Sequence, residues 1–135
     1  MDTENPTLNA NLHHNISRAK ANSISVSLDA HVPHELTISA VDLSVIIGNT
    51  FDNAIEDCAA PADAGARISV SLVQQNKMLF YEIANSCMHA PPKKEGNLHG
   101  YGIGNVRRYV DKYDGTMENR IADDQYRISI RLNCP

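Results

Sequence analysis

Two clusters of residues in this sequence could do chemistry together. Segment 42–58 reads D-L-S-V-I-I-G-N-T-F-D-N-A-I-E-D-C and holds Asn49 and Asn53 four residues apart. Segment 99–106 reads H-G-Y-G-I-G-N-V. Asparagine oxygens are neutral, hard ligands that suit Mg²⁺, and glycines let backbone N–H groups approach phosphate oxygens at the start of a helix. Together the two clusters predict a site for a metal-bound nucleotide triphosphate.

The first cluster lies on a predicted helix with two kinds of surface. At about 100° per residue, its apolar face carries Leu43, Ile47, Phe51, Ala54, Ile55 and Cys58. A narrow polar stripe along one edge of that face carries Asp42, Asn49, Asn53 and Glu56. Two asparagines at this spacing more often bond to loops or water than to a ligand. The surrounding pattern G-N-x-x-D-N-A favours the metal-binding interpretation here, whereas Glu56 and Asp57 fit a solvated face.

The second cluster alternates Gly100, Gly102 and Gly104 before a helix expected to begin near Ile103. It is not a dinucleotide-binding fingerprint, because no strand directly precedes it and the third glycine is missing. It is not a Walker loop, because no Lys-Ser/Thr follows. Taken alone, this turn is equally compatible with a hinge that binds nothing.

Hydrophobic periodicity predicts the elements that must position these residues. We expect helices over 5–21, 40–58 and 103–113, strands over 24–28, 68–72, 78–84, 116–121 and 126–132, a short extended piece at 36–38, and a loop over 86–100. Helices alternating with hairpins predict an α/β (α+β) two-layer sandwich, in which helices cover one face of a mixed, mostly antiparallel sheet. At this length we expect one domain over 1–135, with its N-terminal helix within 1–22.

Composition narrows the function classes. The formal net charge is −4, which argues against a nucleic-acid partner. Basic residues gather at Lys93, Lys94, Arg107, Arg108 and Lys112; this patch suits a small polyanion, and ordinary surface lysines fit equally well. The three cysteines have no metal-ligand spacing and indicate reduced cytosolic thiols. With no signal peptide or membrane-length apolar run, we expect a cytoplasmic domain without direct membrane contact.

Together these motifs resemble the ATPase superfamily of gyrase, heat-shock chaperones, histidine kinases and mismatch-repair proteins, which share the Bergerat-type ATP-binding fold. The likeness is closest to the catalytic domain of sensor histidine kinases, particularly the quorum-sensing peptide-receptor branch. It rests on Asn5–Ala10 (N-P-T-L-N-A), on Asn49–Ala54 (N-T-F-D-N-A), and on G-Y-G-I-G-N-V-R-R over 100–108. The motifs also follow the family's order along nearly the whole chain.

The resemblance implies ATP and Mg²⁺ as cofactors and assigns roles to the site residues. Asn53 matches the principal Mg²⁺ ligand, and Asn49 would be an auxiliary ligand. Asn85 would recognise adenine, and residues 86–100 would form the ATP lid. The phosphates would be held by Gly100, Gly102, Ile103 and Gly104.

Two departures from the superfamily pattern bear on activity. Where Asp-x-Gly-x-Gly is usual, segment 85–89 reads N-S-C-M-H, so the acceptor oxygen remains while the charge and both glycines are lost. Hydrolytic members carry a glutamate base four residues before the metal asparagine, and here that residue is Asn49. The absence of this base favours phosphoryl transfer over hydrolysis.

The resemblance therefore implies a protein histidine kinase of a two-component signal-transduction system. The acceptor histidine would lie on a separate dimerisation domain of the parent kinase, because neither His13 nor His14 has the family's acidic neighbour. A response regulator would act downstream, and the parent protein would be membrane-anchored. Two alternatives stay open: a degenerate, partner-docking module without turnover, and a serine kinase of the anti-sigma-factor type.

Overall fold

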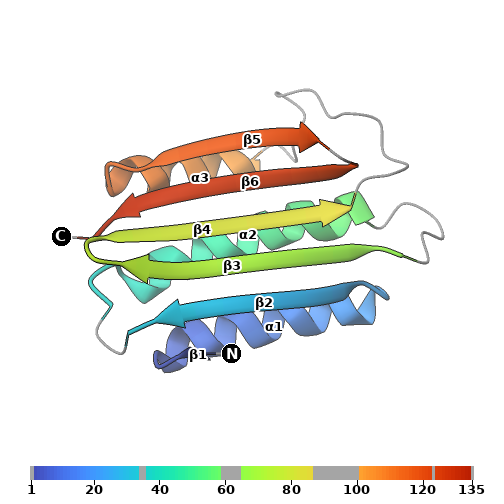
Figure 1. Ribbon diagram of the computed structural model, residues 1–135, viewed down its shortest axis with the longest axis horizontal. Coiled ribbons are helices and arrows are strands. Elements are labelled where there is room, and N and C mark those ends of the chain that lie inside the picture. The colour runs from blue at the N-terminus through green and yellow to red at the C-terminus, as the bar shows by residue number, and fades with distance from the viewer. Residues whose placement is uncertain (1, 34–35, 59–64, 87–100, 123, 135) are drawn as a thin grey trace.

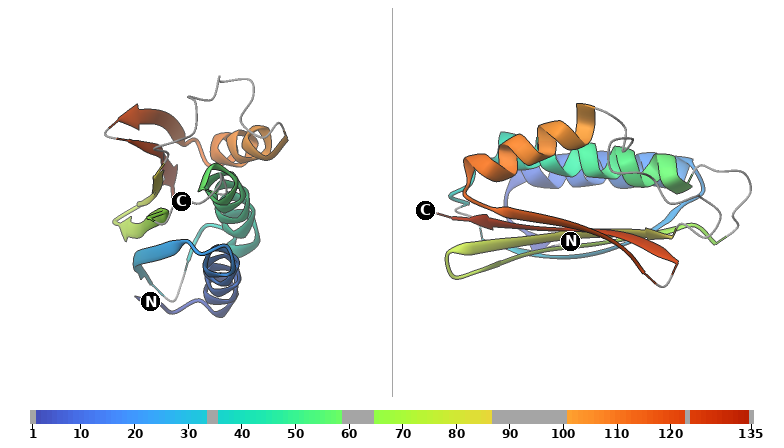
Figure 2. Two further views of the ribbon diagram at one scale, coloured as in Figure 1. Left: turned by 90° about the vertical axis from the view of Figure 1, so that its right-hand side faces the viewer. Right: turned by 90° about the horizontal axis from the view of Figure 1, so that it is seen from above.

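The computed structural model describes residues 2–33, 36–58, 65–86, 101–122 and 124–134. One mixed sheet carries three helices on one of its faces, and the opposite face is open (Figures 1 and 2). The strands are β1 (Asp2–Thr3), β2 (Ser25–Val32), β3 (Arg67–Gln75), β4 (Met78–Ser86), β5 (Thr116–Ala122) and β6 (Gln125–Asn133). The helices are α1 (Pro6–Ala21), α2 (Ala40–Cys58) and α3 (Tyr101–Lys112).

The strands lie in the order β1-β2-β3-β4-β6-β5. The first three run parallel, with α2 as the crossover between β2 and β3, whereas β3–β4, β4–β6 and β6–β5 pair antiparallel. This arrangement confirms the predicted fold class of a mixed, mostly antiparallel sheet with helices on one face.

The core lies between the sheet and the helices. Alternate strand residues point toward the helices and are buried, as in Ile68, Val70 and Leu72 of β3, and their neighbours face the open side. The apolar face of α2 packs on this layer, with Leu43, Ile47 and Phe51 fully buried. Within the described residues, no helix combines the length and the apolar character that a membrane crossing would need.

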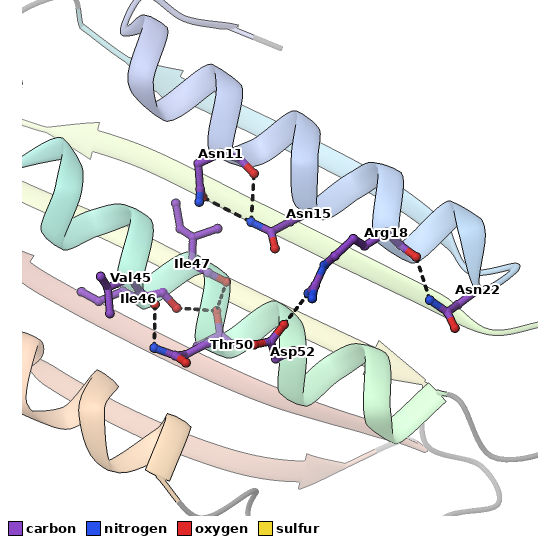
Figure 3. A network of polar contacts seen from close by, with 10 residues as sticks. Asn11, Asn15, Arg18, Asn22, Val45, Ile46, Ile47, Thr50 and Asp52 are labelled. Atoms are coloured by element: carbon purple, nitrogen blue, oxygen red, sulfur yellow. Dashed lines mark hydrogen bonds and ion pairs between the residues drawn. The ribbon is translucent and has the colours of Figure 1, made fainter.

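A buried hydroxyl pair joins α2 to the central strand β4. Thr50 and Tyr81 are 0% and 1% exposed, and their hydroxyl oxygens lie 2.6 Å apart. The Thr50 hydroxyl also lies 2.9 Å from the Ile46 carbonyl and 3.0 Å from that of Ile47 (Figure 3). Threonine has a single hydroxyl proton, and two helix carbonyls lie within its reach. We therefore assign that proton to the helix and Tyr81 as the donor to Thr50. Burial raises the pKa of Tyr81, which keeps it a donor.

Most predicted elements are confirmed, with four differences. The extended piece expected at 36–38 is wrong: the chain bends there, because buried Ile38 is followed directly by the cap of α2, where Ser39 accepts from the Leu43 and Asp42 N–H groups. Strand β1 was not predicted, since two residues carry no periodicity. Helix α3 begins at Tyr101, ahead of the expected start. Of the predicted lid, Ser86 ends β4 and the remainder lies outside the described residues.

The direction of the Thr50–Tyr81 hydrogen bond predicts unequal costs for removing its two partners. Thr50→Val leaves the buried Tyr81 hydroxyl without an acceptor, which should lower the free energy of unfolding by about 1–3 kcal/mol. Tyr81→Phe leaves the Thr50 proton bonded to the helix and should cost only about 0.5–1.5 kcal/mol. Urea denaturation measures both values. Equal costs, or a larger cost for Tyr81→Phe, would contradict the assigned direction.

Candidate functional site

Helices α2 and α3 lie side by side and run in opposite directions (Figure 1). Asp42, at the start of α2, contacts Lys112 and Tyr113 at the end of α3. The beginning of α3, with the glycines of the second motif, therefore lies toward the second half of α2, where Asn49 and Asn53 are. The fold thus places the first cluster and the described part of the second, residues 101–106, on neighbouring antiparallel helices.

Asn53 is the polar residue whose environment most needs an explanation. It is 1% exposed, and neither its Nδ2 nor its Oδ1 atom has a hydrogen-bond partner within the described part of the chain. Burying an amide without partners costs about 1–3 kcal/mol for each group, so such groups are rare in native structures. An amide in this state is suited to receive a ligand.

Asn49, one turn earlier, has a different environment. It is half-buried, and its Nδ2 donates to the Val45 carbonyl at 3.0 Å. This bond commits one side of the amide to the helix itself and leaves Oδ1 as the atom that could contact a ligand. The structure therefore separates two asparagines that the spacing alone treats alike.

Asn85 lies at the end of β4 and is 2% exposed. Its Nδ2 donates to the carbonyl of Ser86 at 3.1 Å, which fixes the amide and leaves Oδ1 as an acceptor. Tyr126 lies directly opposite on β6. Burial, with the nearby charge of Asp57 as a second cause, raises the pKa of Tyr126 to about 12.

The sequence interpretation of Asp57 as a solvated residue is wrong. Asp57 is 7% exposed, whereas Glu56 is exposed as expected. Asp57 follows Asn53 by four residues and therefore lies on the same side of α2. Extending the polar stripe by one more helical turn would have placed Asp57 on the side of Asn53, whereas its burial and its proximity to Tyr126 are seen only in the structure.

The glycine motif is only partly described. Gly102, Ile103 and Gly104 lie in the first turn of α3, and Gly100 lies outside the described residues. Gly104 is exposed, and a Cβ atom there would meet no atom within 4 Å. Packing within the described chain therefore does not require glycine at this position, and the surface beside it is open to a ligand.

The far end of α3 is firmly held. Lys112 Nζ lies 2.8 Å from Asp42 Oδ2, the Tyr113 hydroxyl donates to the same oxygen at 2.5 Å, and the Ser39 N–H donates to that hydroxyl at 3.2 Å. The hydrogen bond from Lys112, with that from Tyr113, lowers the pKa of the Asp42 carboxyl. Asp42 is thus ionised and fixes the C-terminal end of α3 on α2.

The opposite side of α2 faces α1. Arg18 forms an ion pair with Asp52, and Asn15 donates to the Asn11 carbonyl at 2.9 Å (Figure 3). Asp52 is therefore turned toward α1 and away from α3. His13 and His14 are exposed on α1, as expected. Cys58 and Cys134 are buried, and the Cys58 thiol donates to the Ser86 carbonyl at 3.5 Å.

The Asp42 network predicts a pH-dependent contribution to stability. Tyr113→Phe removes one donor to a buried carboxylate and should lower the unfolding free energy at pH 7 by about 1–2 kcal/mol. A carboxyl whose folded pKa is lowered stabilises the fold above its unfolded pKa of about 3.9, and this contribution is lost as the pH falls through the folded value. The deficit of the variant should therefore shrink below about pH 4, as measured by urea denaturation across the pH range.

Tyr109→Phe is the matched control for this experiment. It removes the same hydroxyl from the same helix, at a half-buried residue with no side-chain hydrogen bond to the described residues. Its effect should stay within about 0.5 kcal/mol at every pH. A Tyr113→Phe deficit that is unchanged at acid pH would show that Asp42 is not the group involved.

Comparisons with known proteins agree with this geometry. The GHKL domain family matches residues 38–133, from the residue before the α2 cap to the end of β6. No curated protein sequence matches the chain. Several solved structures share the fold at low sequence identity.

The nucleotide-free catalytic domain of histidine kinase ThkA has a TM-score of 0.74 at 12% identity, over 95% of this chain and 90% of that one. The mycobacterial sensor histidine kinase MprB has a TM-score of 0.70 at 18% identity, over 94% of this chain and 93% of that one. Full-length ShkA in complex with AMPPNP has a TM-score of 0.72 at 15% identity; the match covers 98% of this chain and only 30% of ShkA.

At these identities the structural likeness establishes a common fold, and the quorum-sensing branch stays a prediction. The family match is independent of the structural likeness and includes all of α2, the central hairpin and α3. Because it covers most of the sequence, this chain belongs to the GHKL domain family.

Proposed function

We propose that this chain is the ATP- and Mg²⁺-binding catalytic domain of a sensor histidine kinase. It would transfer the γ-phosphoryl group of ATP to a histidine on a separate dimerisation domain. The observation that carries the proposal is the buried amide of Asn53, which has no partner in the described chain and lies in the half of α2 toward which α3 begins.

The residues present fit a magnesium ion. Asn53 Oδ1 would be the principal protein ligand, and Asn49 Oδ1 would assist it, since its Nδ2 is held by Val45. Neutral ligands leave the charge of the ion free to pair with phosphates, which supply much of the remaining coordination of Mg²⁺ in such sites. When bound, the ion would neutralise charge that develops on the transferred group.

The start of α3 would hold the phosphates. A helix N-terminus presents unpaired N–H groups and a partial positive charge, which together favour anions. Gly102, Ile103 and Gly104 lie in this first turn, and Gly100 precedes it. Their backbone N–H groups would contact the triphosphate, with residues 86–100 as the lid.

Asn85 would select adenine. Because its Nδ2 is engaged by the Ser86 carbonyl, its free Oδ1 can accept a hydrogen bond from the 6-amino group of adenine. The 6-oxo group of guanine offers only an acceptor at that position. Burial strengthens this discrimination. With guanine, Asn85 Oδ1 and the 6-oxo group would both be removed from water, and neither could donate a hydrogen bond to the other.

Transfer is favoured over hydrolysis because the described residues supply no base in the place where hydrolytic relatives have glutamate. That place is Asn49, which cannot take a proton, and neighbouring Asp52 is engaged by Arg18 on the α1 side. Catalysis would then consist of positioning and electrostatic stabilisation. In this proposal the domain is cytoplasmic, its parent is membrane-anchored, and a response regulator acts downstream.

Asn53→Ala is the decisive variant. It should abolish measurable ATP–Mg²⁺ binding in isothermal titration calorimetry, while the unfolding free energy changes by less than about 1 kcal/mol, because no described hydrogen bond is lost. Asn15→Ala is the control: this asparagine is also buried, but it is bonded to Asn11. It should destabilise the fold and leave nucleotide affinity unchanged.

Failure of the wild-type chain to bind ATP–Mg²⁺ would overturn the proposal and favour the partner-docking alternative. An Asn53→Ala variant that binds as tightly as the wild type would remove the metal role of this residue. Strong destabilisation by Asn53→Ala would point to a structural role for its amide.

Asn85→Ala tests base recognition separately. The wild type should prefer ATP to GTP, and the variant should lose about tenfold of that preference, which corresponds to about 1.4 kcal/mol for one hydrogen bond. Competition of the two nucleotides against a fluorescent ATP analogue measures the ratio. An unchanged ratio would show that adenine is recognised elsewhere.

A further inference from the structure

Strand β5 forms one edge of the sheet and pairs only with β6 (Figure 1). It reads T-M-E-N-R-I-A over 116–122 and contains neither proline nor lysine, the residues that commonly protect an edge from other chains. Ile121, near its end, is 47% exposed and is one of three large apolar side chains exposed in the described residues. The edge therefore keeps the backbone groups and the apolar surface that pair with another strand.

The hairpin register fixes which backbone groups face outward. Ala122 pairs with Gln125 across a two-residue connection, so these residues must be the mutually hydrogen-bonded closing pair. Bonded pairs alternate along an antiparallel ladder, so Arg120 and Glu118 also bond toward β6. The N–H and C=O groups of the three residues between them, Met117, Asn119 and Ile121, therefore point away from the sheet.

Two antiparallel copies of β5 are complementary in sequence. If a second copy pairs with the first about a two-fold axis at Asn119, the outward N–H and C=O groups of Met117, Asn119 and Ile121 all form hydrogen bonds with that copy. Glu118 then lies opposite Arg120 of the second copy, and Arg120 lies opposite Glu118 of that copy. Met117 lies opposite Ile121 in the same way. Directly opposed charges of opposite sign and opposed apolar residues both stabilise an antiparallel pair.

The charges of Glu118 and Arg120 have no ion-pair partner among the described residues. Arg120 lies directly opposite Arg127 on β6, and the carboxylate nearest to Arg127 is Glu82, at 2.7 Å. Like charges that face one another across a ladder are destabilising, so a second copy would supply the missing acid.

We propose that this chain associates through β5 with a second copy of itself, forming one continuous sheet with two-fold symmetry. All three helices lie on one face of the sheet (Figure 2). A two-fold axis through Asn119, perpendicular to the sheet, would therefore keep the helices of both copies on the same face. The contact is a single strand edge, small beside standard interfaces. Its affinity therefore falls in the micromolar to millimolar range, about −8 to −4 kcal/mol.

Charge reversal tests the register. The wild-type 135-residue chain should show a monomer–dimer equilibrium in analytical ultracentrifugation at concentrations up to about 1 mM. Glu118→Arg alone places like charges opposite one another in both pairs, and so does Arg120→Glu alone. Each variant should weaken dimerisation by at least tenfold. Asp29→Arg is the control. Like Glu118→Arg, it replaces a carboxylate with an arginine, but at an exposed residue of β2. This variant should dimerise as the wild type does.

Mixing the two single variants gives the sharpest outcome. A chain with arginine at 118 and 120 is complementary to a chain with glutamate at both positions, so the equimolar mixture should recover dimer that neither variant forms alone. Asn119→Pro removes an outward N–H without touching the β6 ladder and should abolish association in a folded chain, as judged by circular dichroism.

A wild-type chain that stays monomeric throughout this range would overturn the proposal. So would dimers that persist in both single variants, or a mixture that does not associate, because either result places the contact elsewhere. These measurements need no nucleotide and therefore stand apart from the proposed kinase function.

Discussion

Helix α2 must satisfy three neighbours at once, which fixes its rotation about its own axis. Thr50 bonds to Tyr81 of the sheet, Asp42 holds the end of α3, and Asp52 is held by Arg18 of α1. Side chains on a helix reach about 5–6 Å from its axis, so a rotation of about 10° would move their ends by about 1 Å. Displacements of that size can cost about a hundredfold in catalysis. The proposed site therefore depends on these three contacts.

The same helix can carry an amide without a partner among the described residues because its other face is so well packed. Leaving an amide group buried and unbonded costs about 1–3 kcal/mol. Burying one large aliphatic or aromatic side chain contributes about 1.5–3 kcal/mol, and Leu43, Ile46, Ile47 and Phe51 are all fully buried on α2. The fold thus tolerates an Asn53 amide that has no partner among the described residues. Thr50, Asp42 and Asp52 are each engaged in one of the three contacts. The Asn53 amide can therefore bond to a ligand without breaking any of them.

Periodicity predicted the elements well, because helices and strands that bury one face repeat their apolar residues every 3.6 or 2 positions. Periodicity predicted less about segments whose conformation is determined by contacts with distant parts of the chain. The bend at Leu36–Ile38 follows from the α2 cap, and β1 is defined only by its pairing with β2. Spacing placed Asn49 and Asn53 on one stripe but could not tell that one bonds within the helix. Likewise, the burial of Asp57 depends on how deep the end of α2 lies, which charge alone does not reveal.

The C-terminal end of α3 is firmly held, and the edge strand β5 leaves the helix from that end. This end is held by Asp42 and continues into a turn where Gly115 is required, because a Cβ there would lie 2.2 Å from the Arg131 carbonyl. A helix of 12 residues is about 18 Å long, so a tilt of about 5° at the fixed end moves the other end by about 1.5 Å. A tilt of this kind about the held end would move the glycines at the start of α3. Strand β5, which leaves the fixed end, keeps its place in the sheet.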